Sequence, residues 1–393
     1  MAYQNVATPR FWVSTLQWLN SLGMITTTTS KDESLTKKTG SDLTYINPIN
    51  PAIFKNTDSN VNDWNIVWKI DNSVQWNSVM QNDNNFFMCL GHNFRSTGGG
   101  VMHLLRPTVL TNDEEHLGKT PYVNYRGSSD QANGYRSEYD GFSIGIDNNA
   151  SDLESSELTF ELRGYFNNVD YKIGSILYGN FFDMPHSPDL NLTMTREYGG
   201  TQTLETRGGS TLSNSYWTKQ PNWGNGLPAW HLYKQANDNA PELDNLAPLS
   251  ISGRRVWNLS FSYLQDQDMF PEISNLTNYE HYQPSGTYTH PYTGVQTEYT
   301  ENAPYYSNSG EAGTHLSGTS RGYALYNFAA NSNFISEVLH KTNGGALPFV
   351  FQPDSSNANP DQFAICMFDQ ESISFKQVAN GVYNISMKIR EVW

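Results

Sequence analysis

Cysteine and charged residues are scarce in this chain of 393 residues. The two cysteines, Cys89 and Cys366, both lie in apolar runs, so we favour buried free thiols over a disulfide, as suits a reducing compartment. Lys and Arg number 24 against 39 Asp and Glu, which gives a formal net charge of −15. Specific nucleic-acid binding is not expected, because phosphates need neutralising cations. An acidic wall can still surround passing DNA without holding it.

Apolar runs long enough to span a membrane are also missing. The first four residues, 1–4, include no basic residue and start no apolar core of the kind that a signal peptide has. We therefore expect no membrane insertion and no secretion.

The common catalytic and metal-binding motifs do not occur: the sequence has no phosphate loop, no nucleophile elbow, no His-Glu-x-x-His and no cysteine pair at zinc spacing. His92 ends an apolar run, and we interpret it as a strand-end histidine bonded to the backbone rather than a catalytic one. Aspartates between residues 140 and 157 offer oxygens to calcium but lack EF-hand spacing, so solvated turns are favoured. Asp266 and Asp268 are interpreted as loop carboxylates rather than an acid–base pair. We predict no enzyme activity, no cofactor and no metal.

Aromatic residues are plentiful, with 23 Tyr, 19 Phe and 10 Trp. Aromatic side chains favour strands, and the many Asn, Ser, Thr and Gly residues favour turns and loops. This composition predicts a mainly β protein with long polar loops rather than a helical bundle.

Two segments alternate with period two, which is typical of strands with one buried and one solvated face. In residues 382–390 the apolar face carries Tyr383, Ile385, Met387 and Ile389. In residues 254–263 it carries Trp257, Leu259, Phe261 and Tyr263.

Between these segments the sequence predicts one short helix. Asn333 is a good N-cap, an apolar stripe follows it, and Gly344-Gly345 ends the helix. The apolar runs 347–351 and 363–368 then read as strands.

The N-terminal part is less regular. Phe11, Trp12, Leu16 and Leu19 have near-helical spacing, which predicts a short helix ending at Gly23. Residues 26–38 are polar and are interpreted as a loop. Several short alternating or apolar runs then follow between turn residues, and they predict an antiparallel, jelly-roll-like β-sandwich.

Four parts are predicted along the chain. Residues 1–55 form an N-terminal segment that packs with the C-terminal domain. Residues 56–190 form the sandwich. Residues 191–264 and 331–393 form a second β-domain, of sandwich or barrel type, with the one packed helix. Residues 265–330 form a long inserted excursion, and loops of this length usually serve a function.

The order of the C-terminal elements resembles the C-terminal domain of phage tail-tube and distal-tail proteins. The strand at 255–263, the helix, the Leu-Pro-Phe-Val-Phe run at 347–351, the strand at 365–368 and the ending at 388–393 carry this resemblance. Residues 208–214, with Trp223 and Trp230 after them, resemble a stretch in tail proteins of marine long-tailed phages. These segments cover about a third of the chain.

The resemblance implies a tail-tube-like fold and a structural virion protein, either a distal tail protein or a baseplate component. In such proteins the sheets of neighbouring subunits join edge to edge around a DNA conduit, and ring closure removes open sheet edges. The implied partners are further copies in a hexamer, the tail tube protein, and tail-tip hub or fibre proteins, with assembly in the host cytoplasm. The candidate ring-interface residues are Trp257, Leu259, Phe261, Tyr263, Tyr383, Ile385, Met387 and Ile389.

A second class of function stays open. Trp217, Trp223 and Trp230 could stack on sugar rings, as expected of a carbohydrate-binding receptor-recognition protein at the tail tip, although core or interface packing is favoured for them. A glycan-cleaving enzyme would need a carboxylate pair that the sequence does not identify.

Overall fold

The computed structural model describes most of the chain outside its longest polar segments. The described residues are 6–29, 35–46, 51–55, 63–76, 79–80, 84–94, 101–107, 114–116, 120–124, 126–127, 135–138, 140–147, 155–163, 170–197, 201–215, 222–223, 227–228, 254–270, 287–289, 296–298, 332–359 and 362–392.

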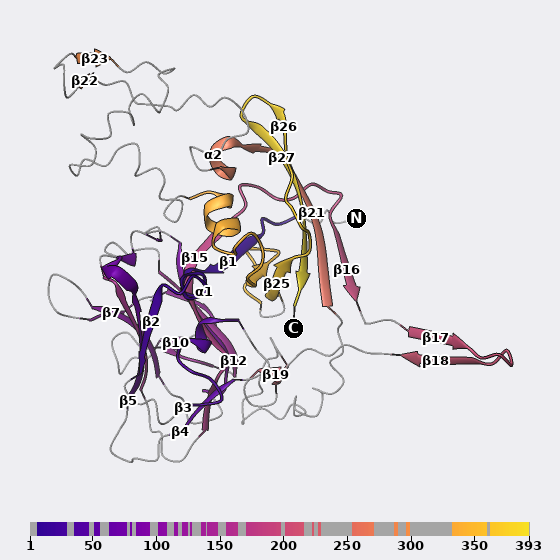
Figure 1. Ribbon diagram of the computed structural model, residues 1–393, viewed down its shortest axis with the longest axis horizontal. Coiled ribbons are helices and arrows are strands. Elements are labelled where there is room, and N and C mark those ends of the chain that lie inside the picture. Colours follow the sequence, from indigo (N-terminus) through magenta and orange to yellow (C-terminus); the bar gives the residue numbers. More distant parts are fainter. Residues whose placement is uncertain are drawn as a thin grey trace.

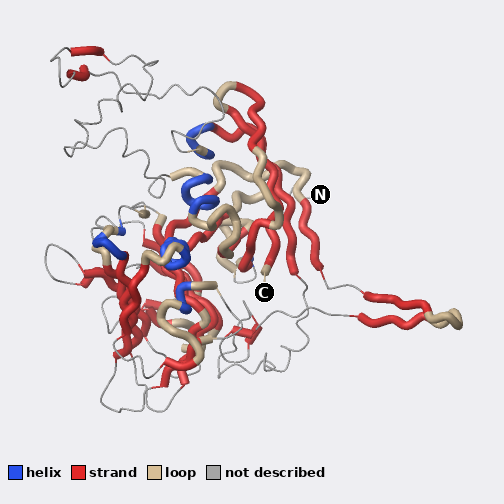
Figure 2. Tube along the Cα trace, viewed as in Figure 1, coloured by secondary structure: helices blue, strands red, loops and turns tan. Residues whose placement is uncertain are grey.

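One antiparallel sheet of eleven strands runs through the protein (Figures 1 and 2). Its order is β16 (Thr193–Glu197), β21 (Arg254–Gln265), β27 (Val382–Glu391), β25 (Ala364–Phe368), β24 (Phe349–Gln352), β1 (Arg10–Ser14), β15 (Ser175–Asp183), β6 (Asn85–His92), β12 (Gly141–Asp147) and β9 (Thr120–Val123), with β26 (Phe375–Ala379) beside β27. The fold is therefore mainly β, as the composition predicts.

A second sheet of seven strands faces part of the first. It contains β10 (Arg126–Gly127), β11 (Tyr135–Arg136), β7 (Val101–Pro107), β13 (Glu157–Arg163), β5 (Asp63–Ile70) and β2 (Ile25–Thr29), with β8 (Glu114–His116) beside β7. A small sheet joins β14 (Asp170–Ile173), β4 (Ala52–Lys55) and β3 (Leu35–Thr36). Three two-stranded hairpins complete the strands: β17 (Thr201–Glu205) with β18 (Thr211–Ser215), β19 (Asn222–Trp223) with β20 (Leu227–Pro228), and β22 (Thr287–Thr289) with β23 (Gln296–Glu298).

Helical segments are few and short in the described residues. They are α1 (Thr15–Ser21), α2 (Asp266–Met269), the 3₁₀ turns Asp42–Thr44 and Asp71–Ser73, and a π-helix, Ile335–His340, which we call the C-terminal helix. Asn333 caps this last helix as expected, because its side-chain oxygen accepts a hydrogen bond from the Ser336 N–H at 2.9 Å. Gly344 and Gly345 follow with φ of 71° and 98°, a backbone conformation that favours glycine.

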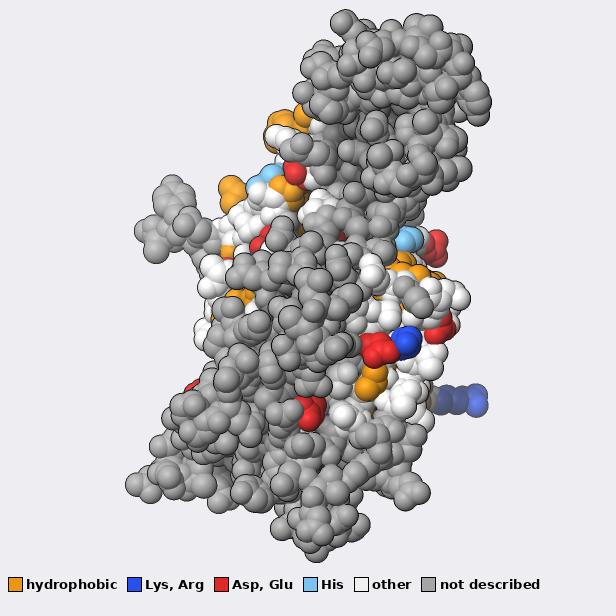
Figure 3. Space-filling view, turned by 90° about the vertical axis from the view of Figure 1, so that its left-hand side faces the viewer, with side chains coloured by type: hydrophobic (Ala, Val, Ile, Leu, Met, Phe, Trp, Pro, Cys, Tyr) orange, Lys and Arg blue, Asp and Glu red, His pale blue; other side chains and the backbone are white. Residues whose placement is uncertain are grey.

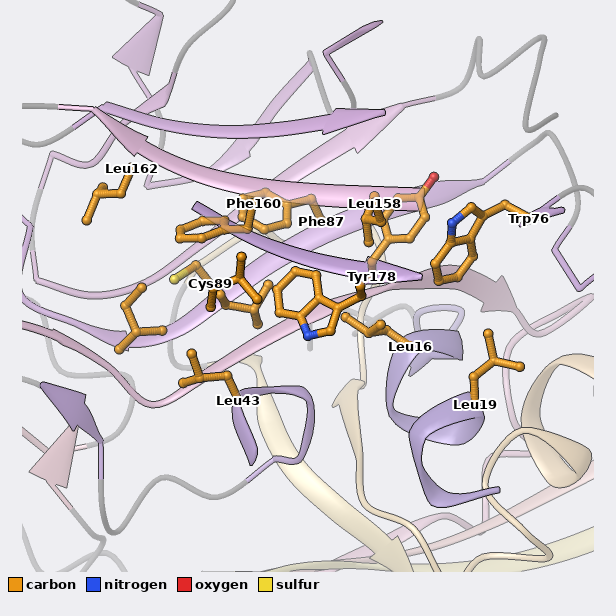
Figure 4. Packing of buried hydrophobic residues seen from close by; sticks show 14 of the residues in the cluster. Leu16, Leu19, Leu43, Trp76, Phe87, Cys89, Leu158, Phe160, Leu162 and Tyr178 are labelled. Atoms are coloured by element: carbon orange, nitrogen blue, oxygen red, sulfur yellow. The ribbon is translucent and has the colours of Figure 1, made fainter. Parts of the chain in front are cut away.

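The core of the sandwich lies between the two large sheets. Figure 4 shows Phe87 and Tyr178 facing Leu158 and Phe160, with Leu16 of α1 closing one side. Ile66, Trp68 and Ile70 of β5 point into this core, as do Leu158, Phe160 and Leu162 of β13. Burial of these aromatic and aliphatic side chains is what holds the sheets together.

The N-terminal segment differs from the predicted helix. Residues 10–14 form β1, which pairs with β15 on one side and β24 on the other, and only residues 15–21 are helical. Phe11 and Trp12 are both fully buried because each face of this central strand is covered. Ser14 caps α1 by accepting a hydrogen bond from the Gln17 N–H at 3.1 Å.

One other expectation was wrong. The polar residues expected in a loop at 26–38 include β2, whose threonines pair with β5, because β-branched side chains fit a sheet even without apolar character. The excursion at 265–330 contains α2 and the hairpin β22–β23, and its remaining residues lie outside the described part of the chain.

The sheet continues across the boundary expected near residue 190. β1 belongs to the N-terminal segment, yet it joins β15 of the sandwich to β24 of the C-terminal part through regular antiparallel pairing. The two parts therefore share one sheet through β1.

Candidate subunit interface

The eleven-stranded sheet ends on an open strand, β16. In the described part of the chain β16 pairs only with β21, so its outer N–H and C=O groups face away from the sheet. Four of its five side chains are exposed, and Met194 is 49% exposed. An uncharged, exposed edge such as Thr193–Thr195 is a template for pairing with another chain.

An apolar groove of about 590 Å³ lies against this edge. Its wall includes Leu190, Leu192 and Met194, together with Trp257 and Leu259 at its base. Leu190 is 88% exposed, which is unusual for a large aliphatic side chain. We call this the edge groove; the remaining lining residues are Val6, Ala7, Pro9, Pro188, Phe351, Pro353, Asp354, Asn357 and Gln362.

The hairpin β17–β18 projects from the body of the protein near the end of β16, and we call it the arm (Figure 1). Leu204 and Leu212 are cross-strand partners on one face of the arm and are 67% and 58% exposed. An isolated two-stranded hairpin is marginally stable in water, so the exposed leucine pair makes the arm a candidate contact surface.

Seven of the eight candidate ring-interface side chains are core residues. Trp257, Leu259, Phe261, Tyr383, Ile385, Met387 and Ile389 are each at most 5% exposed and pack in the C-terminal core of their own chain. The alternation was correctly predicted for β27, but these side chains leave almost no surface for a neighbouring subunit. Contact with a neighbouring subunit through this sheet would have to use the edge strand β16.

Tyr263 was wrongly placed on the buried face of β21. Its φ is +65°, and the pairing with β27 shifts register between Phe261 and Leu264. This β-bulge turns Tyr263 outward, where it is 77% exposed, and puts Leu264 into the core instead. The positive φ of Tyr263 and the register shift mark the bulge, and the apolar pattern of the sequence does not reveal it.

Of the three candidate glycan-stacking tryptophans, Trp223 alone lies within the described residues. Trp223 belongs to β19, where it pairs with Leu227 of β20. Trp217 and Trp230 lie outside the described residues. Their role stays a prediction.

The two cysteines and the candidate carboxylate of Asp268 are at least partly buried. Cys89 and Cys366 are free and fully buried, as predicted, and burial raises the pKa of both thiols. Asp268 is partly buried on α2, and burial raises the pKa of its carboxyl group. Among the described residues, no group of three or more His, Cys, Asp or Glu side chains gathers as a metal site would require.

His92 makes side-chain contacts rather than the backbone hydrogen bonds expected of it. Its Nε2 lies 2.8 Å from the Ser143 hydroxyl, and its ring stacks on Phe94 at 4.6 Å. The ring is fully buried, and this burial lowers the pKa of His92 to about 3.

Because unfolded His92 has a pKa of about 6.5, the unfolded chain binds a proton below that pH while the folded chain does not. Stability should therefore fall as the pH drops through 6.5, by about 2 kcal/mol between pH 7 and pH 5, and this loss should end near pH 3. Urea unfolding of the wild type and of His92→Gln across this range checks the prediction. If the free energy of unfolding changed equally with pH in the two proteins, the prediction would be contradicted.

Few Lys and Arg side chains appear among the described residues on the face drawn in Figure 3, in keeping with the net charge of −15. No helix in the described part of the chain is long and apolar enough to cross a membrane. Comparisons with protein-family models, with curated proteins and with solved structures found no match.

Proposed function

We propose that this protein is a structural component of a phage tail: a distal tail or baseplate ring subunit, hexameric, that links the tail tube to tail-tip or fibre proteins. The observation that carries the proposal is the open edge of the large sheet, which lies beside an apolar groove and near a projecting arm. The resemblance of the C-terminal element order to tail-tube and distal-tail proteins supports the same conclusion.

The arm and the edge groove form a complementary pair of surfaces. The arm points away from its own body (Figure 1), so its leucines are free to reach a neighbouring copy. An arm that docks in the groove of the next subunit makes a head-to-tail contact, and such contacts close into a ring when the rotation per subunit allows it. The acidic chain then suits a conduit that DNA passes without binding.

Removing Leu204 and Leu212 should weaken assembly without unfolding the subunit, because both side chains are largely exposed within one chain. Replacing both by Ser should raise the concentration needed for assembly about tenfold or more, because apolar area buried between subunits is lost. Light scattering coupled to size-exclusion chromatography measures this shift.

The matched control is the double variant Thr203→Ala and Ser213→Ala, which changes a cross-strand pair on the opposite face of the arm. It should assemble like the wild type. Equal assembly of the leucine variant and the wild type would contradict the role of the arm. Deleting the strand from Val382 onward is a poorer test, because β27 lies inside the sheet and carries four core side chains.

A further inference from the structure

A lysine, an asparagine and a glutamate meet inside the protein, away from the edge groove and the arm. Lys341 follows the C-terminal helix and is 0% exposed, while Asn180 on β15 and Glu337 on the helix are each 3% exposed. Phe182, on the same face of β15 as Asn180, contacts the ring of Phe334 next to the helix. Apolar rings therefore line the sheet face on which Asn180 lies.

The three side chains are arranged around the lysine amine. Lys341 Nζ lies 2.8 Å from Glu337 Oε2 and 3.4 Å from Asn180 Oδ1. The amide nitrogen of Asn180 points elsewhere and donates a hydrogen bond to Asn85 Oδ1 at 2.8 Å. The amide carbon of Asn180, Cγ, is thus bonded directly to the oxygen that Lys341 Nζ contacts. The hydrogen bond to Asn85 fixes the orientation of the Asn180 amide group.

Burial acts on the charge of the Glu337 carboxylate. A buried ion pair loses the hydration of both charges, and proton transfer from ammonium to carboxylate removes both charges at once. Burial raises the pKa of the Glu337 carboxyl group, with Lys341 opposing this effect only in part. The second oxygen, Oε1, is buried and has no hydrogen-bond partner among the described residues, so little stabilises the ionised form. A neutral amine is the form that attacks a carbonyl carbon.

We propose that Lys341 and Asn180 become joined by an isopeptide bond within the chain. Lys341 Nζ attacks Cγ of Asn180, the Cγ–Nδ2 bond breaks, and Nδ2 leaves as ammonia. Glu337 accepts the proton from Nζ and returns it to the leaving nitrogen, as a general base and then a general acid. The reaction exchanges one amide nitrogen for another, so it needs no oxidant, reductant or further reactant.

This bond would connect the central strand β15 to the C-terminal helix, two positions that are 161 residues apart in the chain. A covalent link across so long a loop restricts the unfolded chain, as a disulfide does, but reducing agents do not break it. The isopeptide bond would supply a covalent cross-link in a chain whose two cysteines are both free.

Mass spectrometry of the intact, folded, full-length protein tests the proposal. The wild type should be lighter than its sequence by one ammonia molecule. A tryptic digest should contain residues 173–196 covalently joined to residues 322–376, because trypsin cannot cut after a linked Lys341. A wild-type protein of unaltered mass with two separate peptides would overturn the proposal, as would a mass loss that maps to other residues.

Glu337→Gln is the matched variant, since it keeps the size of the side chain but cannot accept the proton. It should retain the full mass of its sequence, with a circular dichroism spectrum like that of the wild type. A linked product in this variant would overturn the part assigned to Glu337. If the variant does not fold, the wild-type peptide map alone decides whether the bond exists.

Discussion

Replacing Glu391 by Ala should destabilise the protein by about 3–5 kcal/mol, because it removes the carboxylate that pairs with the buried guanidinium group of Arg255. Glu391 is 1% exposed and lies at the end of β27. Its carboxylate accepts hydrogen bonds from Arg255 Nη2 at 3.1 Å, from Arg255 Nε at 3.2 Å and from the Arg255 backbone N–H at 2.9 Å. Denaturant unfolding followed by fluorescence measures the loss.

An exposed ion pair provides the control for this change. Lys69 Nζ lies 2.8 Å from Glu157 Oε1 on the neighbouring strand, but the two side chains are 50% and 38% exposed. Glu157→Ala should cost less than about 1 kcal/mol, because solvent screens the pair. A similarly small effect for Glu391→Ala would show that the Arg255 pair does not hold the end of β27 in place.

Replacing Gly179 by Ala should cost about 3 kcal/mol, because no space exists for a methyl group at this position. A Cβ built on Gly179 would lie 2.1 Å from the Val13 backbone oxygen and 2.7 Å from the Thr15 backbone nitrogen. The neighbouring atoms belong to the junction of β1 and α1, so relief would require the strand that joins the two parts of the sheet to move. A shift of the thermal midpoint reports the effect.

Gly208 is the matched glycine for comparison. It lies in the turn of the arm, and a Cβ there would meet no atom within 4 Å. Gly208→Ala should therefore leave the thermal midpoint nearly unchanged. Equal midpoints for the two variants would show that β1 can shift away from β15 without loss, and that the close approach at Gly179 is not needed.

The strands could be predicted from sequence where one simple pattern governs them. Tyr383, Ile385, Met387 and Ile389 alternate because β27 has one face on the core, and the core lies inside one chain. The prediction for β21 fails at Tyr263, because a bulge changes the face and the residue type does not signal it. The same alternation cannot tell a core within one chain from an interface between chains, so it could not exclude the ring contact that the resemblance implies for these residues.

The N-terminal strand was missed for a related reason. Phe11 and Trp12 are adjacent and both buried, and a central strand covered on both faces shows no alternation. The junction between β1 and α1 could have been predicted from Ser14 and Gln17, three residues apart. This spacing is typical of helix starts, and it places the N-cap at Ser14, after Trp12. The edge groove could not be predicted, because its walls come from four separate segments of the chain, from Val6 to Gln362.

The central claim, that copies of this chain form a ring, is tested most directly by the mass and the negative-stain image of the purified full-length protein. The account predicts closed rings with a central hole and a mass that is a whole multiple of one chain. A protein that stays monomeric at the highest concentration reached, and also when mixed with a tail tube protein, would contradict it.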